Sequence, residues 1–460
     1  MSFIQDNNYS RFNSFNKEII DDFEIIEKIG KGTFSIVYKV KNKINNSIYA
    51  MKIIEKSPGN QKDRQEKELR REIDNLLKCY NTRTSGVVFL VGYIETKEQF
   101  KLIFDYCDTN LEEYINQNEE KYKNKKMPLD EIKSLFFELN NGFRNLYNNK
   151  IIHRDIKINN ILIKYRLNDK NDIIPLLADF GISRENSSDE NNPMTNSISW
   201  ALLSAPEILE TGIDYSFASD LWSIGVLLYK LAFGKYPFEG KGFLQIYNNI
   251  KNNEKKLQES GDEHFDDLIK KLLNKNKKKR IKYEDYFKHP FFKYDEPQNI
   301  IDFNKKYNLD ISSHSKVFND FNYNNGNNLL KDLSIIKFVN LKELMLENCN
   351  ISDLSPLESE SFENLLLLDL QRNMIRDLKP LKNIKFLMIK EIYLGFNMIN
   401  NISVLKEINF KQLKVISFVQ NLNLILNNEY KSIINFILKK INKNSIKFKK
   451  VTFFKNMSYL

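Results

Sequence analysis

The sequence has few cysteines and no long apolar stretch. Three cysteines among 460 residues, Cys79, Cys107 and Cys349, show neither metal-ligand spacing nor a paired framework, which fits a reducing compartment. No apolar run reaches the roughly 18 residues that a membrane-spanning helix needs, and there is no signal peptide and no glycine at position 2. We therefore expect neither export nor a membrane span, and a protein of the cytoplasm, with the nucleus as the alternative.

The charge is basic but not concentrated. The formal net charge is +10, and the lysines and arginines are spread through Lys/Asn/Ile-rich sequence. Such a spread indicates biased base composition as readily as a polyanionic partner, so we expect no nucleic-acid partner. The strongest local excess lies beyond Glu429, where no acidic residue occurs. Apolar residues interleave there, which favours a capping helix and strand first and contact with an anionic surface second.

Length and composition predict two globular domains. With 460 residues and 42% hydrophobic residues, the chain can fill two cores. We expect a polar leader over residues 1–22 and a first domain over 23–292. A linker with a partial cap over 293–330 then leads to a second domain over 331–460, which has a basic C-terminal cap.

Three short motifs follow one another at loop-sized intervals in the first domain. They are HRDIKINN at 153–160, DFG at 179–181 and APE at 205–207. Each could occur by chance, but this order and spacing are hard to explain otherwise. The chain resembles the serine/threonine branch of the eukaryotic protein kinase family over about 23–292. The resemblance implies an α+β bilobal fold, with a β-rich N-lobe and a helical C-lobe, that transfers the γ-phosphate of ATP to Ser/Thr hydroxyls of proteins.

The resemblance assigns roles to residues of these motifs. Asp155 would accept or orient the proton of the substrate hydroxyl, and Lys157 would neutralise the transferring phosphoryl group. Asn160 and Asp179 would supply oxygen ligands to Mg²⁺. Asp220, which opens an apolar helix, would hold the backbone of the catalytic loop.

An ATP site is expected between a glycine-rich turn and a hinge. Glycines at positions 30 and 32 let backbone pass close to phosphates, and Ser35 stands where a third glycine is usual. Lys52 would reach the α/β-phosphates with Glu72 as its acidic partner and Glu68 as the alternative, while Phe104 would be the gatekeeper. The expected nucleotide-binding residues are Gly30, Lys31, Gly32, Thr33, Phe34, Ser35, Val37, Ala50, Lys52, Phe104, Asp105 and Cys107.

The segment before APE departs from the family pattern. Trp200 stands where a threonine usually bridges the catalytic Asp and Lys, although a small shift would let Ser199 or Ser197 take that role. The alternative function is therefore a catalytically weak or inactive pseudokinase scaffold. By the resemblance to the family, Arg154 predicts regulation by phosphorylation of the loop over 184–199, which an added phosphate could order. That loop carries Ser187, Ser188, Thr195, Ser197 and Ser199. The resemblance also implies that Arg280 pairs with Glu207.

A repeat of 24 residues marks the second domain. Cys349, Asn373, Asn397 and Asn421 are each 24 apart, and a Leu-x-x-Leu-x-Leu type of pattern begins eight residues before each. This resembles leucine-rich repeats and implies an α/β solenoid that recruits a protein partner or substrate. The first alternative is that the repeats serve only as a structural cap on the kinase domain. The second alternative is that they inhibit the kinase. The expected concave row is Glu343, Met345, Glu347, Leu367, Asp369, Gln371, Glu391, Tyr393, Val415 and Ser417.

Overall fold

The computed structural model describes residues 23–421 without 32–34, 44–45, 57–61, 81–85, 167–169, 171, 180–197, 212–214, 253–256, 295, 308, 310, 313–314, 316, 320–325, 360–361, 385–387, 409–411 and 419–420. The chain divides into two compact units, Met1–Lys293 and Tyr294–Leu460. The expected nucleotide contacts Gly32, Thr33 and Phe34 lie outside the described residues. So do the expected phosphorylation sites Ser187, Ser188, Thr195 and Ser197.

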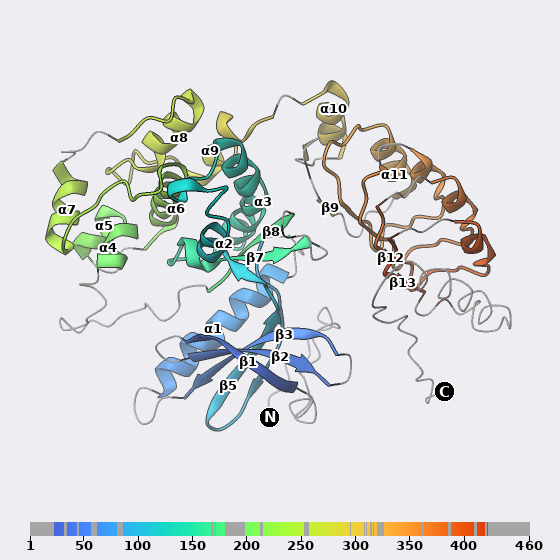
Figure 1. Cartoon of the computed structure of the whole chain (residues 1–460), viewed down its shortest axis with the longest axis horizontal. Helices are drawn as coiled ribbons and strands as arrows, with labels where there is room; N and C mark the ends of the chain where they lie inside the picture. Colours follow the sequence, from blue (N-terminus) through green and yellow to red (C-terminus); the bar gives the residue numbers. More distant parts are fainter. Residues whose placement is uncertain are drawn as a thin grey trace. The chain divides into compact units, whose positions relative to one another are not determined.

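The first unit begins with an antiparallel sheet of five strands. These are β1 (Phe23–Lys31), β2 (Ser35–Asn42), β3 (Ile48–Glu55), β4 (Leu90–Glu95) and β5 (Gln99–Asp105), in the order β1-β2-β3-β5-β4. Helix α1 (Lys62–Tyr80) buries its apolar side in the same core as residues of β3, β4 and β5. Figure 1 shows this sheet and α1 in blue.

The rest of the first unit is mainly helical. Its longer helices are α3 (Leu129–Asn148), α6 (Phe217–Phe233), α7 (Phe243–Asn252) and α8 (Glu263–Leu272). Shorter ones are α2 (Leu111–Gln117), α4 (Ile198–Leu203), α5 (Pro206–Thr211), α9 (Tyr283–Tyr286) and the 3₁₀ turns η3 (Lys123–Lys125), η4 (Ile158–Asn160) and η7 (Pro290–Phe292). A small sheet pairs β6 (Thr109–Asn110), β7 (Ile161–Tyr165) and β8 (Ile173–Leu177). A β-rich part and a helical part therefore form a bilobal architecture.

Two helices form the frame of the helical lobe. Helix α3 buries Ile132, Phe136 and Phe143, which recur at helical spacing on one face. Helix α6 is apolar nearly all round and is buried accordingly, and it ends at Gly234, whose φ of +71° suits glycine. Between α3 and β7 runs the segment that contains the HRD motif, so both ends of that segment are fixed by buried elements.

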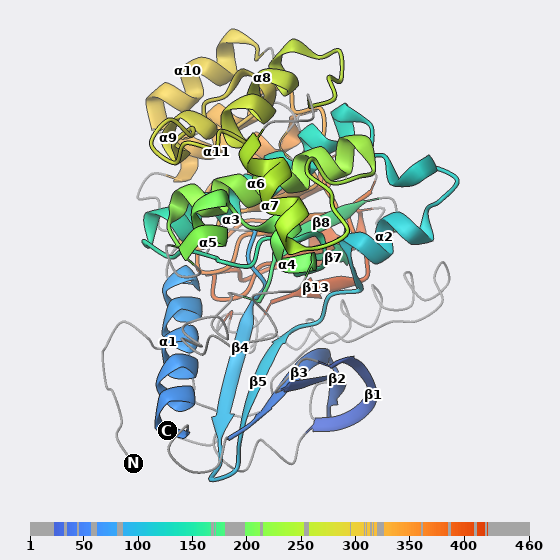
Figure 2. The same cartoon turned by 90° about the vertical axis from the view of Figure 1, so that its left-hand side faces the viewer.

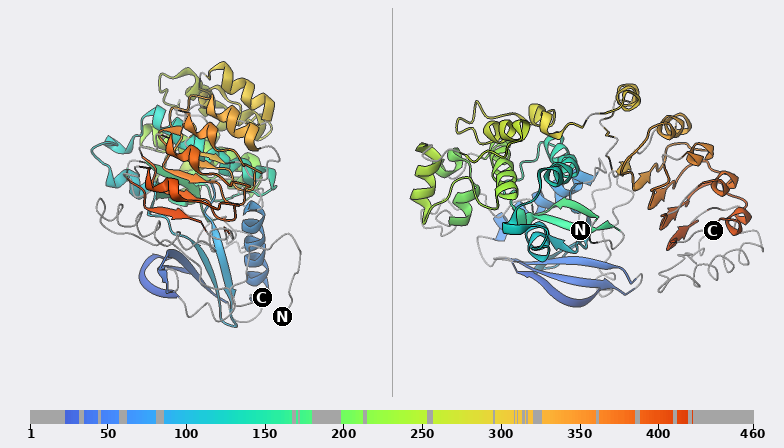
Figure 3. Two further views of the ribbon diagram at one scale, coloured as in Figure 1. Left: turned by 90° about the vertical axis from the view of Figure 1, so that its right-hand side faces the viewer. Right: turned by 45° about the horizontal axis from the view of Figure 1, so that its top comes forward.

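The second unit contains a parallel sheet. Its strands are β9 (Val317–Asn319), β10 (Glu343–Met345), β11 (Leu367–Asp369), β12 (Glu391–Tyr393) and β13 (Val415–Ser417), and they pair in chain order. From β10 on, each strand is in register with the strand 24 residues later. The 3₁₀ turns η8 (Ser355–Glu358), η10 (Lys379–Lys382) and η11 (Ser403–Lys406) recur between strands, and helices α10 (Gln298–Tyr307) and α11 (Gly326–Ser334) precede them. Figure 3 shows the strands stacked side by side, in orange to red.

Buried asparagines connect successive coils of this sheet. The Nδ2 of Asn397 donates to the carbonyls of Leu370, Leu394 and Gly395, and its Oδ1 accepts from Ile375 N at 3.0 Å. Asn373 makes the equivalent contacts one coil earlier. These side chains satisfy buried backbone groups that the turns leave unpaired, so each coil depends on its neighbours.

Among the described residues, no helix is long and apolar enough to cross a lipid bilayer.

Candidate functional site

The HRD segment is held by the buried carboxylate of Asp220 on α6. Its Oδ2 accepts from His153 N at 2.7 Å, and its Oδ1 accepts from Arg154 N at 2.9 Å. Burial raises the pKa of Asp220 to about 7, although these two N–H donors and Arg154 work in the opposite direction. Arg154 has a φ of +68°, a left-handed conformation that such anchoring stabilises. The expected contact between Asp220 and this backbone is confirmed.

The carboxylate of Asp155 lies between two donors. Oδ2 of Asp155 accepts from Lys157 Nζ at 2.8 Å and from Asn160 Nδ2 at 2.9 Å. Asn160 also donates to the carbonyl oxygen of Asp155 at 2.8 Å. The Asp155 side chain is 12% exposed, so this carboxylate has a fixed orientation but remains accessible. A fixed carboxylate beside a lysine can accept a hydroxyl proton and stabilise an adjacent anion.

Lys52 contacts Asp179 rather than Glu72. Its Nζ is 2.7 Å from Asp179 Oδ1, and no ion pair joins Lys52 directly to Glu72 in the described part of the chain. Burial lowers the pKa of Lys52, but the carboxylates of Asp179 and Glu72 outweigh it and raise that pKa overall. The sequence-based expectation of a direct Lys52–Glu72 pair therefore differs from the structure, because Asp179 takes the contact.

Glu72 nevertheless faces this charge cluster. It is 6% exposed on the inner side of α1. Burial raises the pKa of Glu72 to about 7, Lys52 lowers it, and the negative charge of Asp179 raises it further. Lys52 in turn lowers the pKa of Asp179, chiefly by its charge. The three groups are thus coupled, and Lys52 has a second carboxylate within electrostatic range.

The sheet register brings several expected nucleotide contacts together. Gly30 pairs with Val37, and Val37 pairs with Lys52. Further along β3, Ala50 pairs with Phe104 at the end of β5. Lys31 ends β1 and Ser35 begins β2 on either side of the glycine-rich turn. These residues form one continuous strip across the sheet.

The hinge after β5 is partly buried. The N–H of Asp105 donates to Phe89 O at 2.9 Å, and its carboxylate is 3.5 Å from Lys164 Nζ. Burial raises the pKa of the Cys107 thiol to about 12, so this thiol stays protonated near neutral pH. Asp105, which ends β5, is therefore held by Phe89 and Lys164, and Cys107 contributes bulk rather than a reactive thiolate.

Asn160 and Asp179 have the chemistry of a magnesium site. The backbone N–H of Ala178 donates to Asn160 O at 2.9 Å, which places the residue before Asp179 against Asn160. The Nδ2 of Asn160 donates hydrogen bonds to Asp155, so the Oδ1 of Asn160 is the atom that can serve as a metal ligand. An amide oxygen and a carboxylate are hard ligands that suit Mg²⁺, with phosphate and water completing the shell. The two side chains fit such an ion.

Trp200 packs against a neighbouring helix. It lies on α4, is 8% exposed, and stacks on Phe243 of α7 with ring centroids 6.3 Å apart. Ser199 is the preceding residue of the same helix. Lys157 and Asp155 contact each other directly instead of through a residue at position 200.

A small pocket beside Asp155 is lined by Arg154, Leu203, Tyr215 and Ser223 among others. Motif spacing gives no signal for Leu203, Tyr215 or Ser223, because the fold brings them there from distant positions.

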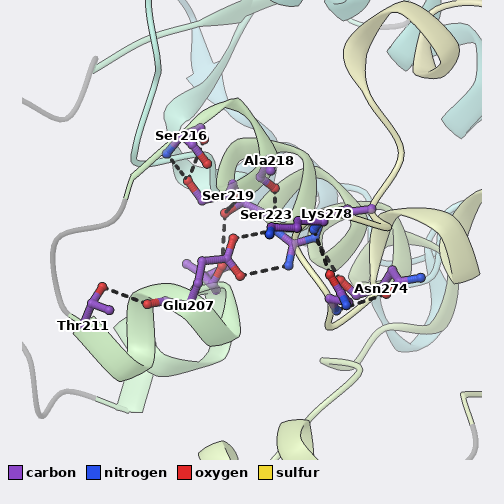
Figure 4. Close-up of polar contacts among 11 residues, drawn as sticks. Glu207, Thr211, Ser216, Ala218, Ser219, Ser223, Asn274 and Lys278 are labelled. Carbon is purple, nitrogen blue, oxygen red and sulfur yellow. Dashed lines mark hydrogen bonds and ion pairs between the residues drawn. The ribbon is translucent and has the colours of Figure 1, made fainter.

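The Glu207–Arg280 pair is present. Arg280 Nη1 and Nη2 are 2.7 and 3.0 Å from Oε1 and Oε2 of Glu207, so the contact is bidentate (Figure 4). Arg280 also donates to the carbonyls of Ala218 and Asn274. Its guanidinium lies over the Trp222 ring at 5.1 Å. This pair joins α5 to the end of the helical lobe, next to the pocket beside Asp155.

Comparison with known proteins agrees with this geometry. The protein kinase domain family matches residues 23–292. The chain is 30% identical over 285 residues to the serine/threonine-protein kinase ATG1b of Arabidopsis thaliana, covering 59% of this chain and 37% of the relative. It is 31% identical over 281 residues to an Aurora kinase of Yarrowia lipolytica, covering 60% and 70%. For the mouse serine/threonine-protein kinase 36 the identity is 29% over 276 residues, covering 59% and 19%.

The matched region is one part of several of these relatives. The chain spans about a third of the ATG1b length and about a fifth of serine/threonine-protein kinase 36. Within this chain, the family match covers more than half of the residues and includes the HRD, DFG and APE motifs. The chain therefore belongs to the protein kinase family.

Proposed function

We propose that the protein is a serine/threonine protein kinase that transfers the γ-phosphate of ATP to Ser or Thr hydroxyls of protein substrates, with Mg²⁺ as its metal. The main support is the carboxylate of Asp155, held between Lys157 and Asn160 on a backbone that Asp220 anchors. Phosphoryl transfer asks a protein mainly for positioning and for stabilisation of charge, which such an arrangement provides.

Each polar residue would have one role. Asp155 would accept the proton of the attacking hydroxyl as that oxygen bonds to phosphorus, and Lys157 would offset the negative charge on the phosphoryl oxygens. Lys52 would contact the α/β-phosphates and exchange Asp179 for Glu72 as its partner. Bound Mg²⁺ would neutralise phosphate charge between Asn160 and Asp179. The strip from Gly30 to Lys52, with Ala50, Phe104, Asp105 and Cys107, would enclose the nucleotide.

One observation favours an alternative. Trp200 is buried against α7 inside a helix, at the position where the family resemblance leads us to expect a substrate-docking threonine. A catalytically weak pseudokinase scaffold that only binds partners would tolerate this arrangement. Measured turnover separates the two functions.

We further propose that the second unit is a leucine-rich repeat solenoid that recruits a substrate or regulator. The 24-residue register and the asparagine contacts between coils support it. The partly exposed side of its strands would supply the contact surface. The proposed arrangement is a leader (1–22), a kinase domain (23–292), a linker with a partial cap (293–330) and a repeat domain with a basic end (331–460), in the cytoplasm or nucleus.

The test is ³²P transfer from γ-labelled ATP to a generic basic protein in the presence of Mg²⁺. We expect the full-length chain to turn over at up to roughly 1–100 s⁻¹ when active, and Asp155→Asn to abolish transfer because the proton acceptor is lost. Asp130→Asn removes an exposed carboxylate at the start of α3 and should leave transfer intact. Equal background from the wild type and Asp155→Asn would contradict the kinase function and favour the scaffold.

A further inference from the structure

Four charged residues connect α1 to the sheet. Lys56 directly follows β3, the strand that carries Lys52. Its Nζ is 3.0 Å from Glu66 of α1 and 2.8 Å from Glu95 at the end of β4. Arg70, one turn beyond Glu66, places Nη2 2.8 Å from the same Glu95 oxygen. Glu95 is thus shared by a strand end and a helix.

The cluster is partly shielded from water. The Lys56 side chain is 8% exposed, and Glu66 and Glu95 are 20% and 25% exposed. Lys56 Nζ lies over the buried ring of Phe100 at 4.6 Å, and the Arg70 guanidinium lies near the same ring at 5.8 Å. Burial lowers the pKa of Lys56, but Glu95 and Glu66 raise it overall. Because these charged groups are partly shielded from water and share partners, their contacts define the position of α1 more closely than exposed ion pairs would.

The other attachment of α1 to the sheet is apolar. Leu69, Ile73 and Leu76 share a core with Ile54 and Phe100. Apolar burial is not directional, so it permits α1 to rotate or slide by a small amount. The charged contacts lie on the turns just before Glu72, and Figure 2 shows α1 running beside β4. They therefore fix the part of α1 on which the position of Glu72 depends.

We propose that Lys56, Glu66, Arg70 and Glu95, here called the N-lobe clamp, position α1 so that Glu72 can hold Lys52 once Asp179 turns to the metal. This proposed role of the clamp rests on the proposed kinase function. Its members are positioning residues, because they act through Glu72 and Lys52 and contact neither nucleotide nor substrate. The structure motivates this role, since Lys52 has Asp179 as its direct partner while Glu72 is near but unpaired with it.

The test compares Glu95→Gln with Glu98→Gln in the full-length protein. Both changes remove one carboxylate from the same β4–β5 hairpin, but in the described part of the chain Glu98 contacts the clamp through its backbone, where its carbonyl accepts from Lys56 N at 2.8 Å, and not through its carboxylate. Two quantities are measured: kcat and KM for ATP and a basic peptide, and hydrogen–deuterium exchange of the α1 amides. Lys56→Met serves as a second variant, because Lys56 contacts both carboxylates of the clamp.

For Glu95→Gln we expect kcat to fall about tenfold with peptide KM unchanged, because small displacements of positioning groups cost up to ~100-fold in rate. Exchange of α1 should accelerate, and Glu98→Gln should match the wild type. If Glu95→Gln keeps its kcat, or its α1 amides exchange as in the wild type, the clamp role is overturned. If the wild type itself transfers no phosphate, the proposed function fails, and the exchange of α1 alone decides whether the clamp holds the helix.

Discussion

His153 is a buried residue whose charge state affects folding. It is 1% exposed, and its Nδ1 lies 3.4 Å from the backbone nitrogen of Asp155. Burial lowers the pKa of His153 from 6.5 to about 4, although the negative charge of Asp155 opposes this. The neutral imidazole is therefore part of the folded structure around the HRD motif.

This shift predicts a pH dependence of stability. The folded-state pKa is below the unfolded value, so the unfolded chain binds the proton first as pH falls. The contribution of His153 is complete above about pH 6.5 and is lost progressively toward pH 4. Urea unfolding at several pH values should show a smaller loss of unfolding free energy in this range for His153→Gln than for the wild type. Parallel curves for the two proteins would contradict the assignment.

The Glu207–Arg280 pair predicts an asymmetry between single and double variants. Glu207→Ala leaves a buried guanidinium without its carboxylate and should cost about 3–5 kcal/mol of unfolding free energy. The double variant Glu207→Leu/Arg280→Met should cost less, because no buried charge remains. As a control, Lys270→Gln breaks an exposed pair with Glu259 and should change stability by less than about 1 kcal/mol. Additive losses in the double variant would argue against this explanation.

Some contacts of the site follow from sequence, and others do not. The motifs predict that Asp220 holds the HRD backbone and that Arg280 meets Glu207, and both contacts are present. The choice of Asp179 over Glu72 by Lys52 depends on how α1 and the backbone at Asp179, with φ of +54°, are placed. No local pattern encodes that placement, because it results from packing between distant segments.

At the scale of elements, the asparagines of the second unit act as connectors between coils. Asn397→Ala would leave the N–H of Ile375 and three carbonyls without this buried partner, at a cost of about 2–3 kcal/mol. Asn383→Ala is the matched control, since Asn383 is exposed and contacts Glu358 on the surface. Thermal unfolding of the two variants measures the difference, and equal midpoints would show that the buried contacts add little.

Element boundaries were only partly predictable. Helix α3 (Leu129–Asn148) can be predicted from the sequence, because its apolar residues recur at helical spacing. Helix α4 had no such signal: its six residues are too few for a periodic pattern, and Trp200 is buried by Phe243 from another helix. The N-lobe clamp could not be predicted from the sequence either, since its members come from β4, α1 and the end of β3.

At the scale of the whole molecule, the two units have separate cores. The largest core of the first unit runs from Ile54 to Phe292, and that of the second from Ile300 to Phe418. Because each unit has a buried core of its own among the described residues, we predict two calorimetric transitions for the full-length chain. Fragments 1–293 and 294–460 should each retain one of them. A single transition that disappears when either part is removed would contradict independent folding.

The register of the parallel sheet has a consequence for insertions and deletions. Strands β11, β12 and β13 are offset by whole multiples of 24 residues, and each connector asparagine occupies the same place in its coil. Excising residues 374–397 would therefore join Asn373 to Met398 with the pattern intact, so that a shorter stack results. Removing a single residue next to β12 (Glu391–Tyr393) would instead move the side chains of that strand from their inward or outward positions and shift its connector asparagine. For this half of the chain, a large deletion is milder than a small one.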